Sequence, residues 1–174
     1  MALTQTQVSM LYVAIFNRAS EGNGNTYWQD KGTMIEVANA MLDTTDAQEY
    51  FGSSLDSNQA FIEWIYQNTL NKTLADDPDG IQYWVTQLES GASRGEVVAG
   101  LVEAVEQYAE STDAETKAAY DQFMNRVAVS DYTANTLAEA PLDYKQSLGF
   151  GDELPVTNDP ATVSAAEGNV AGLA

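Results

Sequence analysis

Three aspartates precede a glycine in the middle of the chain: Asp76, Asp77 and Asp79 come just before Gly80. Clustered carboxylates beside a glycine turn are the hard oxygen ligands that calcium prefers. The spacing reproduces only the opening of an EF-hand loop, because Leu88 stands where the bidentate glutamate of position twelve belongs. The sequence therefore makes Asp76, Asp77 and Asp79 a candidate calcium site that lacks its usual strongest ligand.

The same segment also has the features of an ordinary helix start. Asp77 suits the N-cap position, and Pro78 suits the first helical position, where the missing backbone N–H of proline costs little. The matching segment in the first half of the chain, residues 21–25, has a single acid. Two interpretations stay open: calcium bound specifically at this loop, or calcium held diffusely by an acidic surface.

Elsewhere the sequence has few of the residues that catalysis commonly requires. The 174 residues include no histidine and no cysteine, which removes the commonest general base, thiolate nucleophiles, disulfides and zinc–sulfur sites. Carboxylate pairs of the kind that glycosidases use can be assembled from the 26 acids in many ways, and nothing singles out one pair. We expect a protein that is not an enzyme.

The charge of the chain limits its partners. A net charge of −19 results from 26 acidic and 7 basic residues. Such a chain repels phosphate backbones, so nucleic acid is not an expected partner. It also repels anionic lipid head groups unless divalent cations bridge the two. No run of 18 apolar residues occurs, so we expect no segment that inserts into a membrane.

A degenerate duplication organises the chain. The pattern Gly-x-x-Tyr-Trp occurs at residues 24–28 and again at 80–84. Each copy follows an aromatic helical stretch with a related ending, Phe-Asn-Arg-Ala at 16–19 and Leu-Asn-Lys-Thr at 70–73. A repeat at this spacing predicts that one helical unit was copied and stacked.

Helical periodicity predicts an all-α, compact domain over residues 1–150. Apolar residues recur at helical spacing, as in Val8, Leu11, Tyr12, Ile15 and Phe16, and no convincing strand alternation appears. We expect two stacked degenerate repeats and a C-terminal cap: unit one at about residues 4–52, unit two at about 57–109, and capping helices at about 112–150 that close the open face of unit two.

Helix starts and the chain end complete the predicted organisation. Residues of the N-cap type begin helices at Thr4, Thr33, Ser57, Ser93 and Thr112, and most are followed three residues later by Glu or Gln. Beyond about residue 151 there are no aromatic side chains, and the residues are small or polar. We expect residues 151–174 to be a flexible linker that leads to a further C-terminal region.

The Tyr-Trp pairs admit two interpretations. Tyr27, Trp28, Tyr83 and Trp84 can stack on sugar rings, or each tryptophan can anchor its helix in the core with only the tyrosine hydroxyls reaching solvent. Because the pairs occupy equivalent positions in both copies, and because buried aromatic rings dominate packing, we favour the core interpretation.

The repeated residues resemble a recurring bacterial domain of unknown function. The resemblance rests on Leu-Tyr at 11–12, on the two Gly-x-x-Tyr-Trp patterns, and on Glu-Ser-Gly-Ala-Ser-Arg at 89–94. That domain appears in large secreted or surface proteins, including calcium-binding proteins of the RTX type. More narrowly, the segments at 8–12, 19–25 and 127–132 are similar to the N-terminal region of Gram-negative S-layer proteins.

The resemblance implies a helical domain that anchors a self-assembling surface layer to lipopolysaccharide O-antigen on the outside of a Gram-negative cell, assisted by calcium. The implied partners are lipopolysaccharide and further copies of the chain. Such proteins leave by type I secretion with a C-terminal signal, which agrees with an N-terminus that lacks the features of a secretory signal peptide. The alternative is a self-assembly or adhesion module without sugar affinity.

Overall fold

The computed structural model describes residues 2–139, 148–150 and 155–173. In these ranges the fold is all-α, as predicted, and extended pairing is limited to a single bridge between Arg18 and Gly149. The helices, in chain order, are α1 (Gln5–Phe16), α2 (Gly22–Gln29), α3 (Met34–Leu42), α4 (Thr45–Phe51), the 3-10 helix η1 (Gly52–Leu55), α5 (Asn58–Leu70), α6 (Pro78–Glu89), α7 (Arg94–Glu106), α8 (Ala114–Thr136) and α10 (Pro160–Ala171).

The duplication predicted from the sequence is visible in the backbone. Helices α1, α2 and α3 of unit one correspond to α5, α6 and α7 of unit two. Asn17 and Asn71 end α1 and α5, and both adopt the left-handed conformation, with φ of 48° and 53°. Thr33 and Ser93 cap α3 and α7 with their side-chain oxygens. Each unit is therefore a helical triplet with the same stop and start signals.

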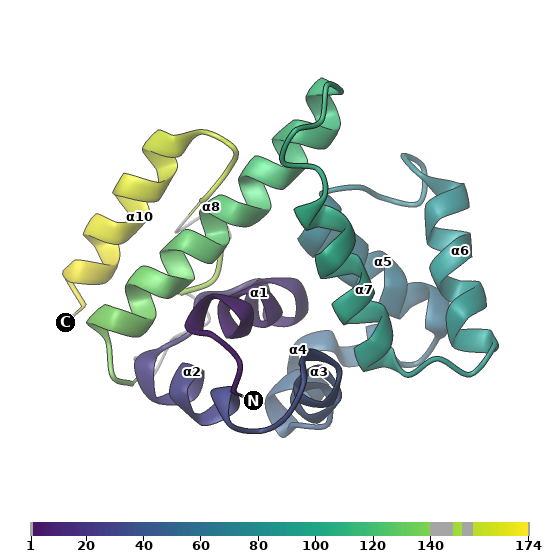
Figure 1. The fold of residues 1–174 in the computed structure, drawn as a ribbon, viewed down its shortest axis with the longest axis horizontal. Helices are drawn as coiled ribbons and strands as arrows, with labels where there is room; N and C mark the ends of the chain where they lie inside the picture. The colour runs from purple at the N-terminus through teal and green to yellow at the C-terminus, as the bar shows by residue number, and fades with distance from the viewer. Residues whose placement is uncertain (1, 140–147, 151–154, 174) are drawn as a thin grey trace.

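Equivalent helices of the two units pack against each other, α1 against α5 and α3 along α7 (Figure 1). Asn39 of α3 accepts a hydrogen bond from the backbone N–H of Gly95 at 2.7 Å and donates one to the Ser93 hydroxyl at 3.1 Å. A Cβ atom on Gly95 would lie 2.5 Å from the carbonyl oxygen of Ile35. The absence of a side chain at Gly95 thus lets α3 and α7 approach closely.

The core forms where these helices converge. Burial of its apolar side chains provides the main driving force for folding, and most of the largest fully buried ones come from α1, α3, α5, α6, α7 and α8. They include Leu11, Ile15, Met41, Phe61, Ile62, Ile65, Ile81, Leu101 and Phe123.

Helix α8 is the expected capping helix, but it lies across both units instead of closing only unit two. It packs along α1 and also contacts α2, α5 and α7 (Figure 1). Asp131 of α8 accepts hydrogen bonds from the hydroxyls of Thr6 and Ser9, both at 2.7 Å. These charge-assisted bonds fix the position of α8 on unit one.

The prediction that α8 starts at Thr112 is wrong by one residue. Asp113 is the N-cap, and its carboxylate accepts hydrogen bonds from the backbone N–H of Thr116 at 3.0 Å and from the Thr116 hydroxyl at 2.6 Å. A carboxylate is at least as good an N-cap as a hydroxyl, so Asp113 takes the position. The C-terminal part of the predicted capping segment, residues 140–147, lies outside the described residues.

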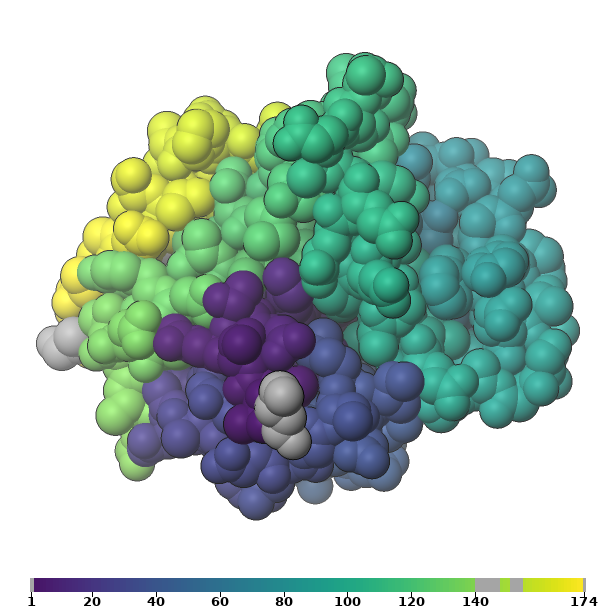
Figure 2. Space-filling model, in the orientation of Figure 1, coloured from purple at the N-terminus to yellow at the C-terminus, as the bar shows by residue number. Residues whose placement is uncertain are grey.

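The chain end differs from the expected flexible linker, because residues 155–173 are ordered against α8. Helix α10 packs along α8, and Figure 2 shows the two in contact on one face. Val156 and Val170 are fully buried, and Arg126 of α8 donates a hydrogen bond to the Val156 carbonyl at 2.9 Å. Small apolar residues on one face of a helix therefore suffice here without any aromatic side chain.

Among the described helices, none is long and apolar enough to cross a membrane.

Candidate functional site

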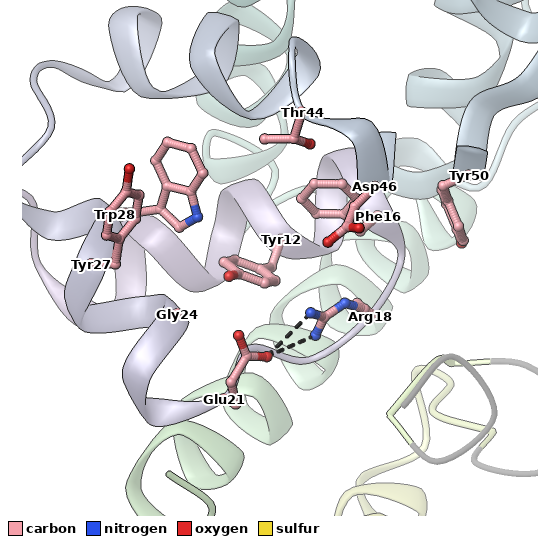
Figure 3. A pocket seen from close by; sticks show the side chains of 10 residues that line it. All are labelled: Tyr12, Phe16, Arg18, Glu21, Gly24, Tyr27, Trp28, Thr44, Asp46 and Tyr50. Atoms are coloured by element: carbon pink, nitrogen blue, oxygen red, sulfur yellow. Dashed lines mark hydrogen bonds and ion pairs between the residues drawn. The ribbon is translucent and has the colours of Figure 1, made fainter. Parts of the chain in front are cut away.

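Unit one carries a surface pocket between α1, the following loop, α2 and α4, which we call the unit-one pocket (Figure 3). Its volume is about 200 Å³. It is rich in aromatic rings, with a few charged groups at one edge. The residues that line it are Tyr12, Phe16, Arg18, Glu21, Gly24, Tyr27, Trp28, Thr44, Asp46 and Tyr50.

Aromatic rings form the floor and the walls of the unit-one pocket. Tyr12 and Phe16, one turn apart on α1, are buried, and their ring centroids are 5.6 Å apart. Trp28 and Tyr50 pack partly buried against the core on either side. The Tyr27 ring meets Trp28 edge-on at 4.9 Å and is 56% exposed. The pocket therefore presents both a recessed and a solvent-exposed aromatic surface.

The charged edge consists of an ion pair and a further carboxylate. Both terminal nitrogens of Arg18 lie 3.1 Å from one Glu21 oxygen, and both side chains are largely buried. The Arg18 guanidinium also lies 5.0 Å from the centre of the Tyr12 ring, within cation–π range. Asp46, at the start of α4, is exposed. This edge thus offers hydrogen-bond donors and acceptors next to apolar ring faces.

Burial affects the phenol groups of Tyr12 and Tyr50, two of the residues that line the pocket. Burial, followed by the charge of Glu21, raises the pKa of Tyr12 above its ordinary value of 10.0. Burial also raises the pKa of Tyr50. Each hydroxyl is therefore neutral at physiological pH and able to donate a hydrogen bond.

The glycine of each Gly-x-x-Tyr-Trp pattern has a steric role. A Cβ atom on Gly24 would lie 2.6 Å from the Tyr12 hydroxyl, and one on Gly80 would collide with the Tyr66 hydroxyl. Contacts this short do not occur for a real Cβ atom. The glycines therefore allow α2 and α6 to lie directly on a tyrosine of the preceding helix.

The core interpretation of the tryptophans is supported in both units, since Trp28 and Trp84 pack against the buried cluster. The tyrosine rings are more exposed than expected, at 56% for Tyr27 and 57% for Tyr83. Trp84 lies against α7, where a Cβ atom on Gly100 would be 2.8 Å from its ring. In unit one, by contrast, the Tyr-Trp pair lines the pocket.

The aspartate loop is held by internal hydrogen bonds. Asp77 is the N-cap of α6, as one interpretation predicted: one carboxylate oxygen accepts from the Gly80 N–H at 3.0 Å, and the other accepts from the Tyr66 hydroxyl. The Tyr66 hydroxyl is also the main reason that the pKa of Asp77 is lowered. Asp76 accepts from the backbone N–H and the hydroxyl of Thr73 at 2.9 and 3.0 Å.

These bonds bear on how well the loop fits a calcium ion. Asp79 lies in the first turn of α6, whereas Asp76 and Asp77 are turned to separate partners. In the part of the chain that the structure describes, no three acidic side chains are grouped so that they can hold one ion. The arrangement of Asp76, Asp77 and Asp79 therefore does not fit a specific calcium site, and we derive no role for a bound ion at this loop.

Sequence reasoning missed the α4 side of the pocket, namely Thr44, Asp46 and Tyr50. The predicted helix starts include Thr33 but none near Thr44, whereas the structure ends α3 at Leu42 and starts a separate helix, α4. Thr44 caps the new helix by accepting from the Ala47 N–H at 3.1 Å. The Thr-Thr-Asp run at 44–46 was the available signal, because such residues favour helix starts.

Comparison with known protein families gives a match for part of the chain. No curated protein matches the chain, and no solved structure matches it. Residues 38–111 match the family described as "Domain of unknown function (DUF4214)", a range that contains most of α3 and the whole of unit two.

Proposed function

We propose that this chain is a non-catalytic domain of a cell-surface protein of the S-layer type, and that it anchors that protein to lipopolysaccharide by binding O-antigen sugar. The observation that carries the proposal is the unit-one pocket, in which aromatic rings stand beside a fixed pattern of charged and hydroxyl groups. The match at residues 38–111 is compatible with it but describes no function.

The chemistry of the pocket suits a sugar ring. A pyranose has an apolar C–H surface and a rim of hydroxyls, so it needs aromatic faces together with hydrogen-bond partners in one place. Tyr27 and Trp28 supply aromatic surface, while Arg18, Glu21 and the Tyr12 hydroxyl supply polar groups. The Arg18–Glu21 pair is already locked, so little side-chain entropy is lost on binding.

Calcium has a part in the proposal through charge. Lipopolysaccharide is anionic, and a chain with a net charge of −19 is repelled by it at long range. Calcium that bridges the acidic surface to the lipopolysaccharide anions removes this repulsion without requiring a specific protein site. The proposal also includes secretion of the chain to the cell surface and its association there with further copies of itself.

A binding titration tests the proposed function. The domain is titrated with smooth lipopolysaccharide of the source bacterium, in millimolar calcium and again in chelator, with an O-antigen-free rough preparation as control. We expect saturable binding to the smooth form in calcium and a large loss in chelator. Absence of binding to both forms, with calcium-dependent self-association, contradicts anchoring and supports the lattice or adhesion alternative.

A matched pair of variants assigns the binding to the pocket. Tyr27 and Tyr83 are equally exposed and make the same edge-on contact with the following tryptophan, at 4.9 and 5.1 Å. Tyr27→Ala removes pocket surface and should weaken binding on the order of tenfold. Tyr83→Ala, which does not line the pocket, should leave it unchanged. Equal effects of the two substitutions contradict the assignment.

A further inference from the structure

A second hollow lies between unit two and α8, and we call it the polar groove. Its volume is about 350 Å³, and it is formed by the end of α5, the loop after it, the first half of α8 and the segment before α10. In contrast to the unit-one pocket it has no aromatic lining. Its polar lining residues are Asn71, Lys72, Asp76, Glu115, Gln122 and Asn158.

Most of these side chains have unused hydrogen-bonding capacity. The side chains of Asn71, Gln122 and Asn158 make no hydrogen bond to any other described residue, and Asn71 and Asn158 are exposed to solvent. Lys72 interacts electrostatically with Asp76 and Asp77. Three amides that come from three separate segments thus line one hollow with donors and acceptors available. Amides that converge in a concavity and are not used internally can exchange their water for the hydroxyls of a polar ligand.

The equivalent asparagine of unit one does make an internal hydrogen bond, so the free amide at residue 71 is not a general feature of the repeat. Asn17 is the equivalent of Asn71, with the same left-handed backbone, but its side-chain oxygen accepts a hydrogen bond from Arg126 at 3.0 Å. In unit one the amide is used to hold α8, whereas in unit two it lines the groove. The two copies have therefore diverged at this position.

The two hollows nevertheless lie at corresponding places. Phe16 and Arg18 line the unit-one pocket, and their repeat equivalents Leu70 and Lys72 line the polar groove. In each unit, the hollow is formed by the last residue of the first helix and the loop that follows. The end of the first helix thus contributes to a hollow in both units, but the rest of each lining differs: α2 and α4 complete the unit-one pocket, whereas α8 and residue 158 complete the polar groove.

We propose that the polar groove is a second glycan subsite, which takes a sugar of the same polysaccharide by hydrogen bonds alone. This inference rests on the proposed function. One lysine against two carboxylates gives the groove a charge of about −1, which disfavours phosphorylated or carboxylated sugars and favours neutral or amino sugars. A polymer with repeating sugars can occupy both subsites, so its affinity exceeds that of a single repeat through effective concentration.

The variant that tests the groove is Asn71→Gly with Gln122→Ala. Glycine keeps the left-handed conformation at residue 71 while the amide is lost, and neither amide contributes an internal hydrogen bond, so the fold is retained. Gln67→Ala is the matched control. Gln67 is an exposed amide on α5, the helix that ends at Asn71, and it does not line the groove. The probe is the O-polysaccharide released from smooth lipopolysaccharide, together with its single repeat.

In the wild-type protein we expect the polysaccharide to bind at least tenfold more tightly than the single repeat. The double variant should lose that advantage, while Gln67→Ala keeps it. In the wild-type protein, the side-chain NH₂ signals of Asn71 and Gln122 should also shift in NMR spectra when the single repeat is added.

The outcomes separate the two proposals. Wild-type binding that is unchanged in the double variant, with unshifted amide signals, overturns the second subsite and leaves the proposed function standing. Absence of any wild-type binding to the polysaccharide overturns both.

Discussion

The substitution Gly95→Ala tests how the two units are joined. A Cβ atom at this position would lie 2.5 Å from the carbonyl oxygen of Ile35, about 0.9 Å inside the 3.4 Å at which ordinary contacts begin. The oxygen belongs to the backbone of α3, so it cannot rotate away. The same methyl group would also meet the Asn39 amide, which holds the Gly95 N–H at 2.7 Å.

The expected magnitude follows from three terms. Overpacking of this kind costs about 1–3 kcal/mol, and weakening of the Asn39 hydrogen bond costs about 1 kcal/mol more. The higher helix propensity of alanine stabilises the folded protein by about 1 kcal/mol and offsets part of this cost. We therefore expect Gly95→Ala to lower the free energy of unfolding by roughly 1–3 kcal/mol, measured by urea denaturation followed by circular dichroism.

Gly168 is the internal control. It lies inside α10, and a Cβ atom there would meet nothing within 4 Å. Gly168→Ala should therefore stabilise the protein by about 0.5–1 kcal/mol, because only the propensity gain applies. If Gly95→Ala stabilises the protein as Gly168→Ala does, the close packing of α3 on α7 is refuted.

Three further predictions concern charge and backbone. The Tyr66 hydroxyl is the main cause that lowers the pKa of Asp77 below 3.8. The ionised Asp77 carboxylate therefore stabilises the fold at neutral pH, and this stabilisation is lost as the pH falls through the lowered pKa. Asp77→Asn, still a good N-cap, should reduce the melting temperature at pH 7 and make the melting temperature fall less steeply below about pH 4. Burial, then Glu103, raises the pKa of Glu106 above 4.5, so Glu106→Gln should raise the melting temperature at pH 7 and lose this advantage in acid, where the wild-type side chain is protonated. Asn71→Ala should cost about 1 kcal/mol in urea denaturation, because alanine is strained in the left-handed region, whereas Asn71→Gly should be close to neutral.

Local signals in the sequence predicted much of the fold correctly. The capping boxes at Thr4 and Thr33 and the caps at Ser57 and Asp77 are present as predicted. Each depends on a hydrogen bond between residues three positions apart, so the sequence contains all the information that is needed. The duplication was recognisable for the same reason, since its stop and start signals are local.

Features that depend on tertiary contacts were not predictable in this way. The segment before α10 is held by Arg126, a residue of α8 whose side chain donates a hydrogen bond to the Val156 carbonyl. The unit-one pocket likewise needs α4, which no repeat pattern marks, to bring Tyr50 beside Phe16. The polar groove combines a loop of unit two with α8 and residue 158. The spacing of residues along the sequence does not reveal such contacts between distant segments.

Sugar binding at the unit-one pocket is tested most directly by the indole N–H signals of the three tryptophans in ¹H–¹⁵N spectra, recorded while O-polysaccharide is added in calcium. Trp28 lines the pocket, whereas the Trp64 indole donates a hydrogen bond to the Ile15 carbonyl at 3.2 Å and serves as internal reference. We predict that the Trp28 signal shifts saturably and that the Trp64 signal stays in place. Saturable binding with an unmoved Trp28 signal, or no binding at all, would contradict glycan recognition by this pocket.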